Sequence, residues 1–338
     1  MTQPTYPIEE LLSKRILILD GAMGTMIQKL NLEEHHFRGE RFKNHPKPLK
    51  GNNDLLTLTK PEKISQIHRQ YLDSGADLIE TNTFSSNAIA MEDYGLEDLC
   101  YELNVAAARL AKRLCQEYTQ NNPLKPRFAV GSIGPTSKTA SLSPDVSDPA
   151  FRAVDFETLR EAYATQCEGL IDGGVDVLLV ETIFDTLNAK AALFAISQVL
   201  ERKNRDLPVM VSGTITDASG RTLSGQTLEA FLISISHVRL LSVGLNCALG
   251  AGQLFPYMYE LSRKTSLCTS VYPNAGLPNA FGGYDQGPQA MAMEMVPYLE
   301  KELVNIVGGC CGTTPEHIEA LSALCNRYKP RKALPVTL

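Results

Sequence analysis

Eight short apolar runs alternate along this chain with amphipathic segments of helical periodicity. The apolar runs cover residues 15–20, 76–80, 128–133, 175–181, 208–214, 241–247, 267–272 and 304–310. The helical segments cover about 60–75, 97–120, 155–172, 185–203, 226–239, 251–265 and 289–301, and a last one follows Pro315. Apolar strands that alternate with helices pair in parallel, and eight such units close into a barrel. The pattern therefore predicts an α/β fold, a (β/α)8 TIM barrel, as a single domain over residues 1–338.

Two other architectures deserve comparison with the barrel. A chain of 338 residues is long enough for two modest domains. An open, doubly wound sheet would usually carry a glycine-rich phosphate turn such as GxGxxG after an early strand. The turn GAMGTM at 21–26 does not match it, and no GxxxxGK[ST] occurs in the sequence. In the barrel interpretation, long loops follow the first and third strands, and Thr59 caps the helix that begins near Pro61.

The charge of the chain gives no general reason to expect nucleic acid or a membrane as a partner. Its formal net charge is −6 and its pI is near 5.6. No stretch approaches the roughly 18 apolar residues of a membrane span. The first residues, MTQPTYPIEE, are polar and acidic, unlike a secretory signal. We therefore expect a cytoplasmic protein whose partners are small molecules and other proteins.

Reactive side chains recur where the predicted strands end. Active sites of this barrel lie at the carboxyl ends of the strands, so residues far apart in sequence would meet on one rim. Those at or just after strand ends are Asp20, Glu80, Glu181, Cys247, Asn274 and Cys310.

Three of the eight cysteines suit a metal site. Cys310 and Cys311 are adjacent and flanked by glycines, which allow the chain to turn so that both sulfurs face one point. Cys247 ends another strand. Three thiolates fit a soft four-coordinate ion such as Zn²⁺ and leave one position open, where an entering thiol would be deprotonated. A strained redox disulfide, or two packed thiols, are the alternatives. The other cysteines are predicted to pack in the core: Cys100, Cys115, Cys167, Cys268 and Cys325.

The rim acids have two interpretations. Asp20, Glu80 and Glu181 either cap neighbouring backbone or surround an ammonium group. Backbone N–H groups in the glycine turn after Asp20 could then hold a carboxylate, as an amino acid bearing a thiol would require. Asn274 is either a turn residue or a neutral fourth zinc ligand. Four histidines are expected to be solvated: His35, His36, His45 and His317.

Motifs along nearly the whole chain carry a family resemblance. They include DGAMGTMIQ (20–28), FRGERF (37–42), KGNNDLL (50–56), ETNTF (80–84), SPDVSDPAFR (143–152), ETIFDTLNAKAA (181–192), SGTITDASGRTLSGQT (212–227), GLNCALG (244–250), PNAGLPNAFG (273–282) and NIVGGCCGTTPEHI (305–318). The sequence resembles the homocysteine-binding domain of cobalamin-dependent methionine synthase, within the homocysteine S-methyltransferase superfamily.

The resemblance implies a substrate, a metal and a reaction. The homocysteine thiolate, activated by Zn²⁺, would take the methyl group of methylcobalamin and give methionine and cob(I)alamin. The implied zinc ligands are Cys247, Cys310 and Cys311, with Asn274 as the fourth ligand that substrate displaces. Asp20 and Glu181, on the same rim as Glu80, would receive the ammonium group. Gly21 and the turn from Thr81 to Phe84 would lie near the substrate carboxylate.

The same resemblance implies partner domains, and two alternative functions remain. The family's enzyme continues into folate-binding, cobalamin-binding and reactivation domains, whereas this chain stops at KALPVTL, so we expect a cobalamin-binding domain in cis or in trans. A cobalamin-independent relative would use betaine or S-methylmethionine as donor. Binding of a quaternary ammonium favours an aromatic cage, for which Trp is best, and the chain has no Trp. A non-catalytic zinc or redox module is the competitor from another class.

Overall fold

The computed structural model describes residues 7–216, 219–280 and 282–332, so the ends of the predicted 1–338 domain lie outside the described residues. Eight strands in this part of the chain form one parallel sheet in the order β1-β8-β7-β6-β5-β4-β3-β2. A parallel bridge pairs Leu19 with Leu78, and the Asp20 N–H donates to the Leu78 carbonyl at 3.0 Å. These contacts join β1 to β2 and close the sheet. The predicted (β/α)8 barrel is confirmed.

The strands differ in length from their predicted extents. β4 and β6 continue past Glu181 and Cys247, whereas β1 and β8 contain only two residues each because the chain leaves the ladder early at the Gly308–Gly309 turn and at Asp20. The strands are β1 Leu17–Ile18, β2 Leu78–Glu80, β3 Phe128–Ile133, β4 Val177–Ile183, β5 Val209–Gly213, β6 Ser242–Gly250, β7 Cys268–Asn274 and β8 Ile306–Val307.

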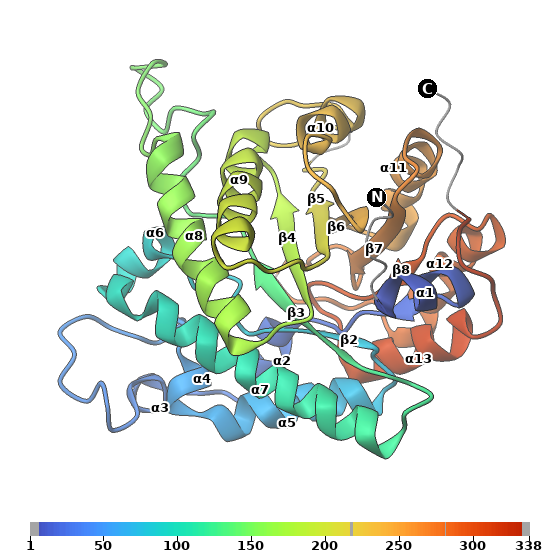
Figure 1. The fold of residues 1–338 in the computed structure, drawn as a ribbon, viewed down its shortest axis with the longest axis horizontal. Helices are drawn as coiled ribbons and strands as arrows, with labels where there is room; N and C mark the ends of the chain where they lie inside the picture. The colour runs from blue at the N-terminus through green and yellow to red at the C-terminus, as the bar shows by residue number, and fades with distance from the viewer. Residues whose placement is uncertain (1–6, 217–218, 281, 333–338) are drawn as a thin grey trace.

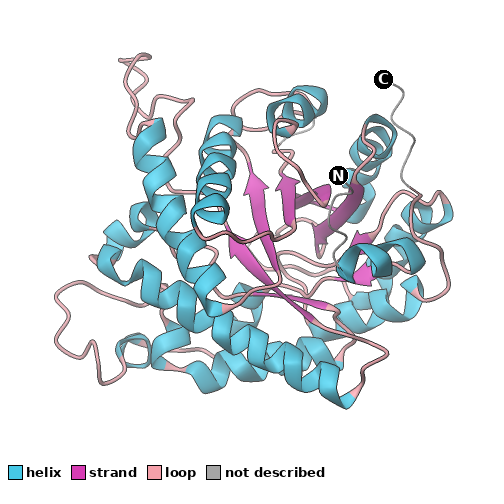
Figure 2. Cartoon of the chain, viewed as in Figure 1, coloured by secondary structure: helices cyan, strands magenta, loops and turns pink. Residues whose placement is uncertain are grey.

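Helices surround the strands on the outside of the barrel (Figures 1 and 2). Each strand is followed by a helix that returns the chain, and α7, α8 and α9 cover the β2–β4 side. The eight helices are α5 Pro61–Asp73, α7 Cys100–Asn121, α8 Phe156–Gly173, α9 Thr186–Arg202, α10 Leu228–Ile235, α11 Ala251–Lys264, α12 Pro288–Glu300 and α13 Pro315–Cys325.

The connection between β1 and α5 is more ordered than a polar loop. It contains three short helices, α2 Met23–Lys29, α3 Glu34–Arg38 and α4 Leu56–Thr59. Thr59 therefore ends α4, and the prediction that it caps the next helix is wrong: Lys60 is the N-cap of α5 and makes no side-chain cap. The β2–α7 connection likewise contains α6 Ala88–Met91 and the 3₁₀ turns Glu92–Tyr94 and Glu97–Leu99. The loop between β3 and α8 projects from the body at the upper left of Figure 1.

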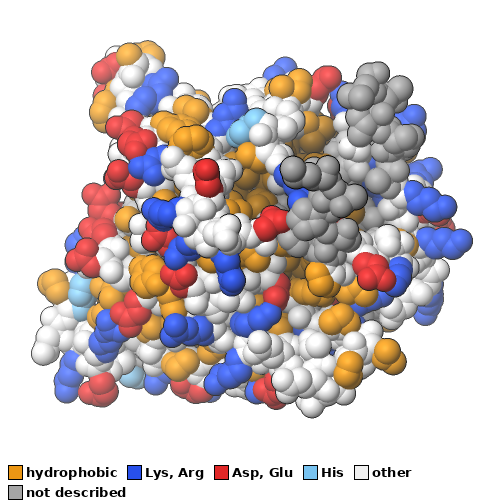
Figure 3. All heavy atoms as spheres, in the orientation of Figure 1, with side chains coloured by type: hydrophobic (Ala, Val, Ile, Leu, Met, Phe, Trp, Pro, Cys, Tyr) orange, Lys and Arg blue, Asp and Glu red, His pale blue; other side chains and the backbone are white. Residues whose placement is uncertain are grey.

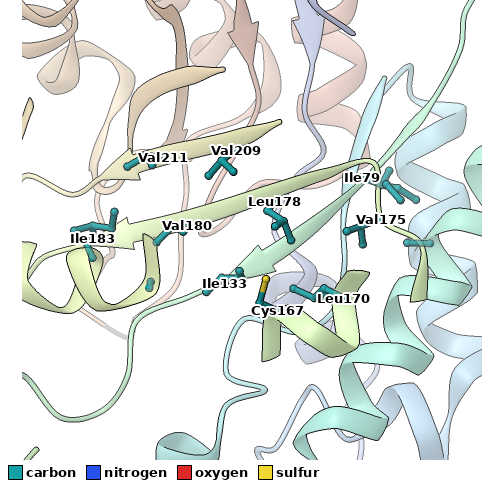
Figure 4. Close-up of a cluster of buried hydrophobic side chains, with 14 of the residues drawn as sticks. Ile79, Ile133, Cys167, Leu170, Val175, Leu178, Val180, Ile183, Val209 and Val211 are labelled. Carbon is teal, nitrogen blue, oxygen red and sulfur yellow. The ribbon is translucent and has the colours of Figure 1, made fainter. Parts of the chain in front are cut away.

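Two apolar layers hold the barrel together. Between strands and helices, Ile133 and Leu178 pack near Cys167 and Leu170 of α8 (Figure 4). Inside the barrel, side chains such as Leu17, Val177 and Met210 form a separate cluster. An N-terminal helix, α1 Pro7–Lys14, adds Ile8 and Leu12 to this inner cluster. The helix therefore plugs the amino-terminal end of the barrel with apolar side chains.

The five cysteines that were predicted to pack in the core do so. Cys100, Cys115, Cys167 and Cys325 are buried, and the half-buried Cys268 packs against the inner cluster. Acidic and basic side chains are interspersed on the face shown in Figure 3. Within the ranges that the structure describes, no helix is both long and apolar enough to cross a bilayer.

Candidate functional site

A cavity of about 1170 Å³ opens at the carboxyl-terminal end of the barrel. Its wall includes residues from the ends of β1, β2, β4, β6 and β8 and from the loops that follow them. The predicted site residues in this wall are Asp20, Gly21, Glu80, Thr81, Phe84, Glu181, Cys247, Cys310 and Cys311. The strand topology thus brings nearly all of them together, as the barrel predicted.

The three cysteines meet at one side of this cavity. Their sulfur atoms all lie within 4.8 Å of one another, and the Cys247 and Cys311 sulfurs are 3.9 Å apart. Sulfur ligands about 2.3 Å from a tetrahedral zinc ion would be roughly 3.8 Å apart. The spacing and the donor set therefore fit a zinc ion bound by three sulfurs, and these residues could hold such a metal.

Unusual backbone conformations position these sulfurs. Cys247 and Ala248 have φ of 58° and 56°, and the β6–β7 register shifts between Asn246 and Gly250. This left-handed conformation is uncommon for residues other than glycine. It interrupts, at Cys247, the alternation of side chains between the two faces of β6. After β8, the Cys310 N–H donates to the Pro273 carbonyl at 2.8 Å.

The Gly308–Gly309 turn is needed for the approach of the last two cysteines. A Cβ at Gly309 would lie 2.6 Å from Thr313, and one at Gly308 would lie 2.8 Å from the Leu19 Cβ. The Cys311 carbonyl in turn accepts a bond from the Ala275 N–H at 2.9 Å. The turn is thus fixed on both sides by backbone, which holds the vicinal cysteines at the rim.

The cysteine trio concentrates negative charge on one sulfur. Hydrogen bonds from Cys247 and Cys310 lower the pKa of Cys311 to about 3, and a bond from Tyr284 also lowers it. The pKa of Cys310 lies well above its usual value because its proton is shared with Cys247 and Cys311. One thiolate is therefore stabilised by two thiols. A divalent cation at the same point would replace the remaining protons.

Three carboxyl groups lie in the same cavity. Asp20 is 3% exposed and Glu181 is 4% exposed. One Asp20 oxygen accepts a bond from the Glu80 N–H at 3.1 Å, whereas its Oδ1 and the Oε1 of Glu80 have no partner among the described residues. Glu181 accepts a hydrogen bond from the Ser132 hydroxyl. Unpaired buried carboxylate oxygens are expensive, so a cationic ligand suits this wall of the cavity.

Burial raises the pKa of each of these acids. The pKa of Asp20 and that of Glu80 lie well above their usual values, chiefly because of desolvation, and the charge of Glu181 adds to both. Desolvation also raises the pKa of Glu181 to about 7, against the Ser132 hydrogen bond, which lowers it. An ammonium group entering here would restore the ionised forms.

The turns expected near a substrate carboxylate are also in the wall. A Cβ at Gly21 would lie 2.8 Å from the Thr313 hydroxyl and from the Tyr71 ring, so only glycine fits there. The Thr81 hydroxyl is already engaged with Thr83 at 2.6 Å, and its N–H pairs with Val130. Phe84 is 39% exposed at the mouth.

Asn274 lies at the end of β7, next to the backbone that anchors Cys310 and Cys311. It is buried, and its side-chain oxygen has no partner among the described residues. It is not among the residues that form the described wall of the cavity. Its predicted role as a fourth ligand stays a prediction.

Sequence reasoning missed several side chains of the site. Ser132, Asn246 and Tyr284 contact predicted site residues, but none is an acid or a cysteine, and Tyr284 lies far from any strand end. The prediction that His317 is solvated is wrong. It is 6% exposed, accepts a bond from the Thr314 N–H, and donates to the Gln286 carbonyl at 2.9 Å. His317 lies in the sequence TTPEH at the start of α13, where its side chain and that of Thr314 form a capping box.

Comparison with known families agrees with this geometry. The family model for homocysteine S-methyltransferase matches residues 17–325. The chain belongs to the homocysteine S-methyltransferase family. Two solved structures of the homocysteine methyltransferase MmuM from Escherichia coli share the fold of this family member. The metallated form is 22% identical, with a TM-score of 0.72, over 93% of this chain and 98% of that chain. The oxidized form is 22% identical, with a TM-score of 0.73, over 94% of this chain and 99% of that chain.

Proposed function

We propose that this homocysteine S-methyltransferase family member binds homocysteine between the cysteine trio and the carboxyl groups and transfers a methyl group to its sulfur. One observation carries the proposal: three converging sulfurs and three carboxyl groups, two of which have oxygens without a partner among the described residues, line one cavity. A ligand with a thiol and an ammonium group satisfies both sets of side chains at once. Homocysteine has both groups.

The residues of the chain divide the work of binding. Cys247, Cys310 and Cys311 would hold Zn²⁺, which supplies a Lewis acid that lowers the pKa of a thiol. Asp20 and Glu181 orient the substrate by its ammonium group, with Glu80 beside them. Gly21, which lies against Thr313 and Tyr71, would present the backbone N–H groups of its turn to the substrate carboxylate. Orientation of the thiol toward the open mouth is the contribution that the fold itself makes to the rate.

We propose methylcobalamin as the methyl donor, carried by a cobalamin-binding domain in cis or in trans. The motifs shared with the cobalamin-dependent branch support this choice, and so does the lack of Trp for a betaine cage. In this view residues 1–338 act as a homocysteine-binding domain, and a folate-binding domain would regenerate the donor. Asn274 would hold the fourth metal position until the substrate arrives.

Metal analysis followed by an assay with three donors tests the proposal. The purified chain should contain one zinc per chain and convert homocysteine to methionine with free methylcobalamin, but not with betaine or S-methylmethionine. Methylation from S-methylmethionine alone would move the chain to the cobalamin-independent branch. Bound zinc that does not respond to homocysteine, with no methylation from any donor, would indicate a structural or redox module.

A further inference from the structure

Two left-handed residues interrupt the strands that carry the acids and the thiols. Thr182, which follows Glu181 on β4, has φ of 55°, and Cys247 on β6 has φ of 58°. The strand register shifts at both places, over 180–183 in β4 and over 246–250 in β6. A left-handed conformation is a genuine outlier for a β-branched residue such as Thr182. Strained residues of this kind persist only where the surrounding structure fixes them.

The Asn246 side chain joins these two strands. Its nitrogen donates to the Thr182 hydroxyl at 2.8 Å, and its oxygen accepts bonds from the Thr182 N–H at 3.2 Å and from the Ser212 hydroxyl at 2.6 Å. Asn246 is fully buried, where the loss of such bonds is costly. Because β5 lies between β4 and β6 in the sheet, this side chain reaches across one strand to connect the strand of Glu181 with that of Cys247.

The same residue contacts the cysteine trio. The Asn246 nitrogen lies 4.0 Å from the Cys310 sulfur, and Cys247 is the next residue in the chain. The Asn246 carbonyl accepts a bond from the Thr214 hydroxyl at 3.1 Å, which ties the backbone before Cys247 to the chain that follows β5. Asn246 therefore has direct contacts on the acid side of the site and on the thiol side.

Regular strand pairing does not fix the separation of these two sides. The Thr182 N–H donates to a side chain where a regular strand would donate to a neighbouring carbonyl, and the pairing of β6 with β7 skips residues 247–249. Binding groups have to be held within about 0.5 Å of their working geometry by supporting hydrogen bonds. Asn246 supplies that support at the point where the sheet does not.

We propose that Asn246 is a positioning residue that fixes the separation between the Glu181 carboxyl group and the cysteine trio, and thereby selects the substrate by the length of chain between its amine and its thiol. The inference rests on the proposed function, in which the acids bind the ammonium group and the metal of the trio binds the thiol. Homocysteine has one methylene more than cysteine, and one carbon–carbon bond is about 1.5 Å long. A ligand that is held at both ends fits one separation best.

The test measures the ratio of homocysteine affinity to cysteine affinity by calorimetry on the zinc-loaded full chain. The wild type should favour homocysteine by about 10- to 200-fold, the effect of one methylene in a fitted pocket. Thr182→Val removes the acceptor of the Asn246 nitrogen and keeps the shape of the side chain, so the ratio should fall about 3- to 10-fold, the factor that one hydrogen bond provides. Asn246→Ala removes all three side-chain bonds and should lower the ratio further.

Two controls separate positioning from stability. Thr269→Val removes the hydrogen bond of another buried strand threonine, whose hydroxyl donates to the Leu303 carbonyl near the amino end of β7. This variant should lower the free energy of unfolding and leave the affinity ratio unchanged. The second control is 2-mercaptoethanol, which has no amine and binds through its sulfur alone, so its affinity should be the same in every variant. An equal loss of homocysteine and 2-mercaptoethanol affinity would mean that Asn246 supports only the trio, which would overturn the inference.

A double variant shows whether Asn246 and Thr182 act through one bond. In the Asn246→Ala protein, Thr182→Val should change the ratio no further, because the bond is already absent. An unchanged ratio in both single variants, or a full additional loss in the double variant, contradicts the proposal. If Asn246→Ala fails to fold, the comparison of Thr182→Val with Thr269→Val decides alone. A zinc-loaded wild type that binds neither amino acid refutes the proposed function instead, so the two failures are distinguishable.

Discussion

Two buried aspartates at opposite ends of the barrel show how differently its ends are built. Asp77, at the amino-terminal end, receives two bonds from Arg15 at 2.7 and 2.9 Å and lies 3.5 Å from Arg127. Asp20, at the carboxyl-terminal end, is equally buried, but its Oδ1 has no partner among the described residues. The first end is closed by ion pairs and by α1, whereas the second has carboxyl groups that remain available to a ligand.

Buried charges at the amino-terminal end of the barrel therefore serve stability, whereas those at the carboxyl-terminal end serve binding. At the closed end a carboxylate is neutralised within the chain, and its loss would leave a buried guanidinium uncompensated. At the open end three acids lie near three thiols, and none of these acids forms an ion pair among the described residues, an arrangement that opposes folding and favours binding. Substitutions at the two ends should therefore have opposite consequences.

The largest effect is expected at the cysteine trio. Cys310→Ala or Cys311→Ala should abolish zinc retention and methylation, because two sulfurs cannot complete the site, while the barrel stays folded. Metal analysis and circular dichroism measure the two outcomes. Cys268→Ala is the matched control, since this half-buried thiol packs against the inner core away from the trio. Unfolding of either trio variant would identify a structural metal site.

The aspartate pair gives the next largest effect. Asp77→Asn should lower the free energy of unfolding by about 3 kcal/mol, because it leaves the buried Arg127 unpaired. Burial raises the pKa of Asp20 well above its usual value, so this carboxyl group opposes folding at neutral pH. Asp20→Asn removes that cost, so its free energy of unfolding should equal or exceed that of the wild type while homocysteine binding weakens. Denaturant titration and calorimetric binding measure both. Equal destabilisation by the two substitutions would remove the distinction between the ends.

The sequence predicted this division only in part. Eight alternating units and the acids at strand ends sufficed for the barrel and its rim, because strand direction alone decides which ends meet. The cysteine trio followed from the same rule. The plug formed by Ile8 and Leu12 and the Arg15–Asp77 pair depend on contacts across the barrel, which no local pattern encodes.

Other details escaped prediction for physical reasons that differ. Cys247 lies inside β6, not at its end, and faces the trio through a left-handed backbone turn that its sequence does not announce. The burial of His317 depends on a partner carbonyl 31 residues away, at Gln286. Tyr284 reaches the site through a loop whose course is set by hydrogen bonds of Asn279.

Glu181→Gln should reduce homocysteine affinity by about 30-fold or more while zinc stays bound. The substitution keeps the shape of the side chain and removes the charge that pairs with the ammonium group, and loss of one partner of a buried pair has about this effect on binding. Calorimetric titration of the zinc-loaded protein measures it. The Glu62→Gln protein is the control, because Glu62 lies exposed on α5. Unchanged affinity would remove Glu181 from the substrate pocket.

The pH dependence of binding should report the same carboxyl group. The pKa of Glu181 is raised to about 7 by burial, so the group is protonated below that pH and ionised above it. Only the ionised form attracts an ammonium group, so homocysteine affinity should rise as pH rises through about 7. The control ligand is 4-mercaptobutyrate, which has the thiol and the carboxylate but no amine. The ratio of the homocysteine affinity to the 4-mercaptobutyrate affinity cancels the effect of thiol titration. A ratio that does not change with pH contradicts the assignment.

The smallest effect is expected from Ser132→Ala. The serine hydroxyl donates to Glu181 and lowers the pKa of that carboxyl against the burial that raises it. Without this donor the carboxylate is harder to form, so the midpoint of the affinity ratio should move to higher pH by up to about one unit, the free energy of a single hydrogen bond. Ser197→Ala, on the outer helix α9, is the control. The change at Ser132 leaves all three acids and all three sulfurs in place. A shifted midpoint with full affinity at high pH would therefore show that the Ser132 hydroxyl sets the pKa of Glu181. A loss of affinity at every pH would mean instead that Ser132 positions the carboxylate.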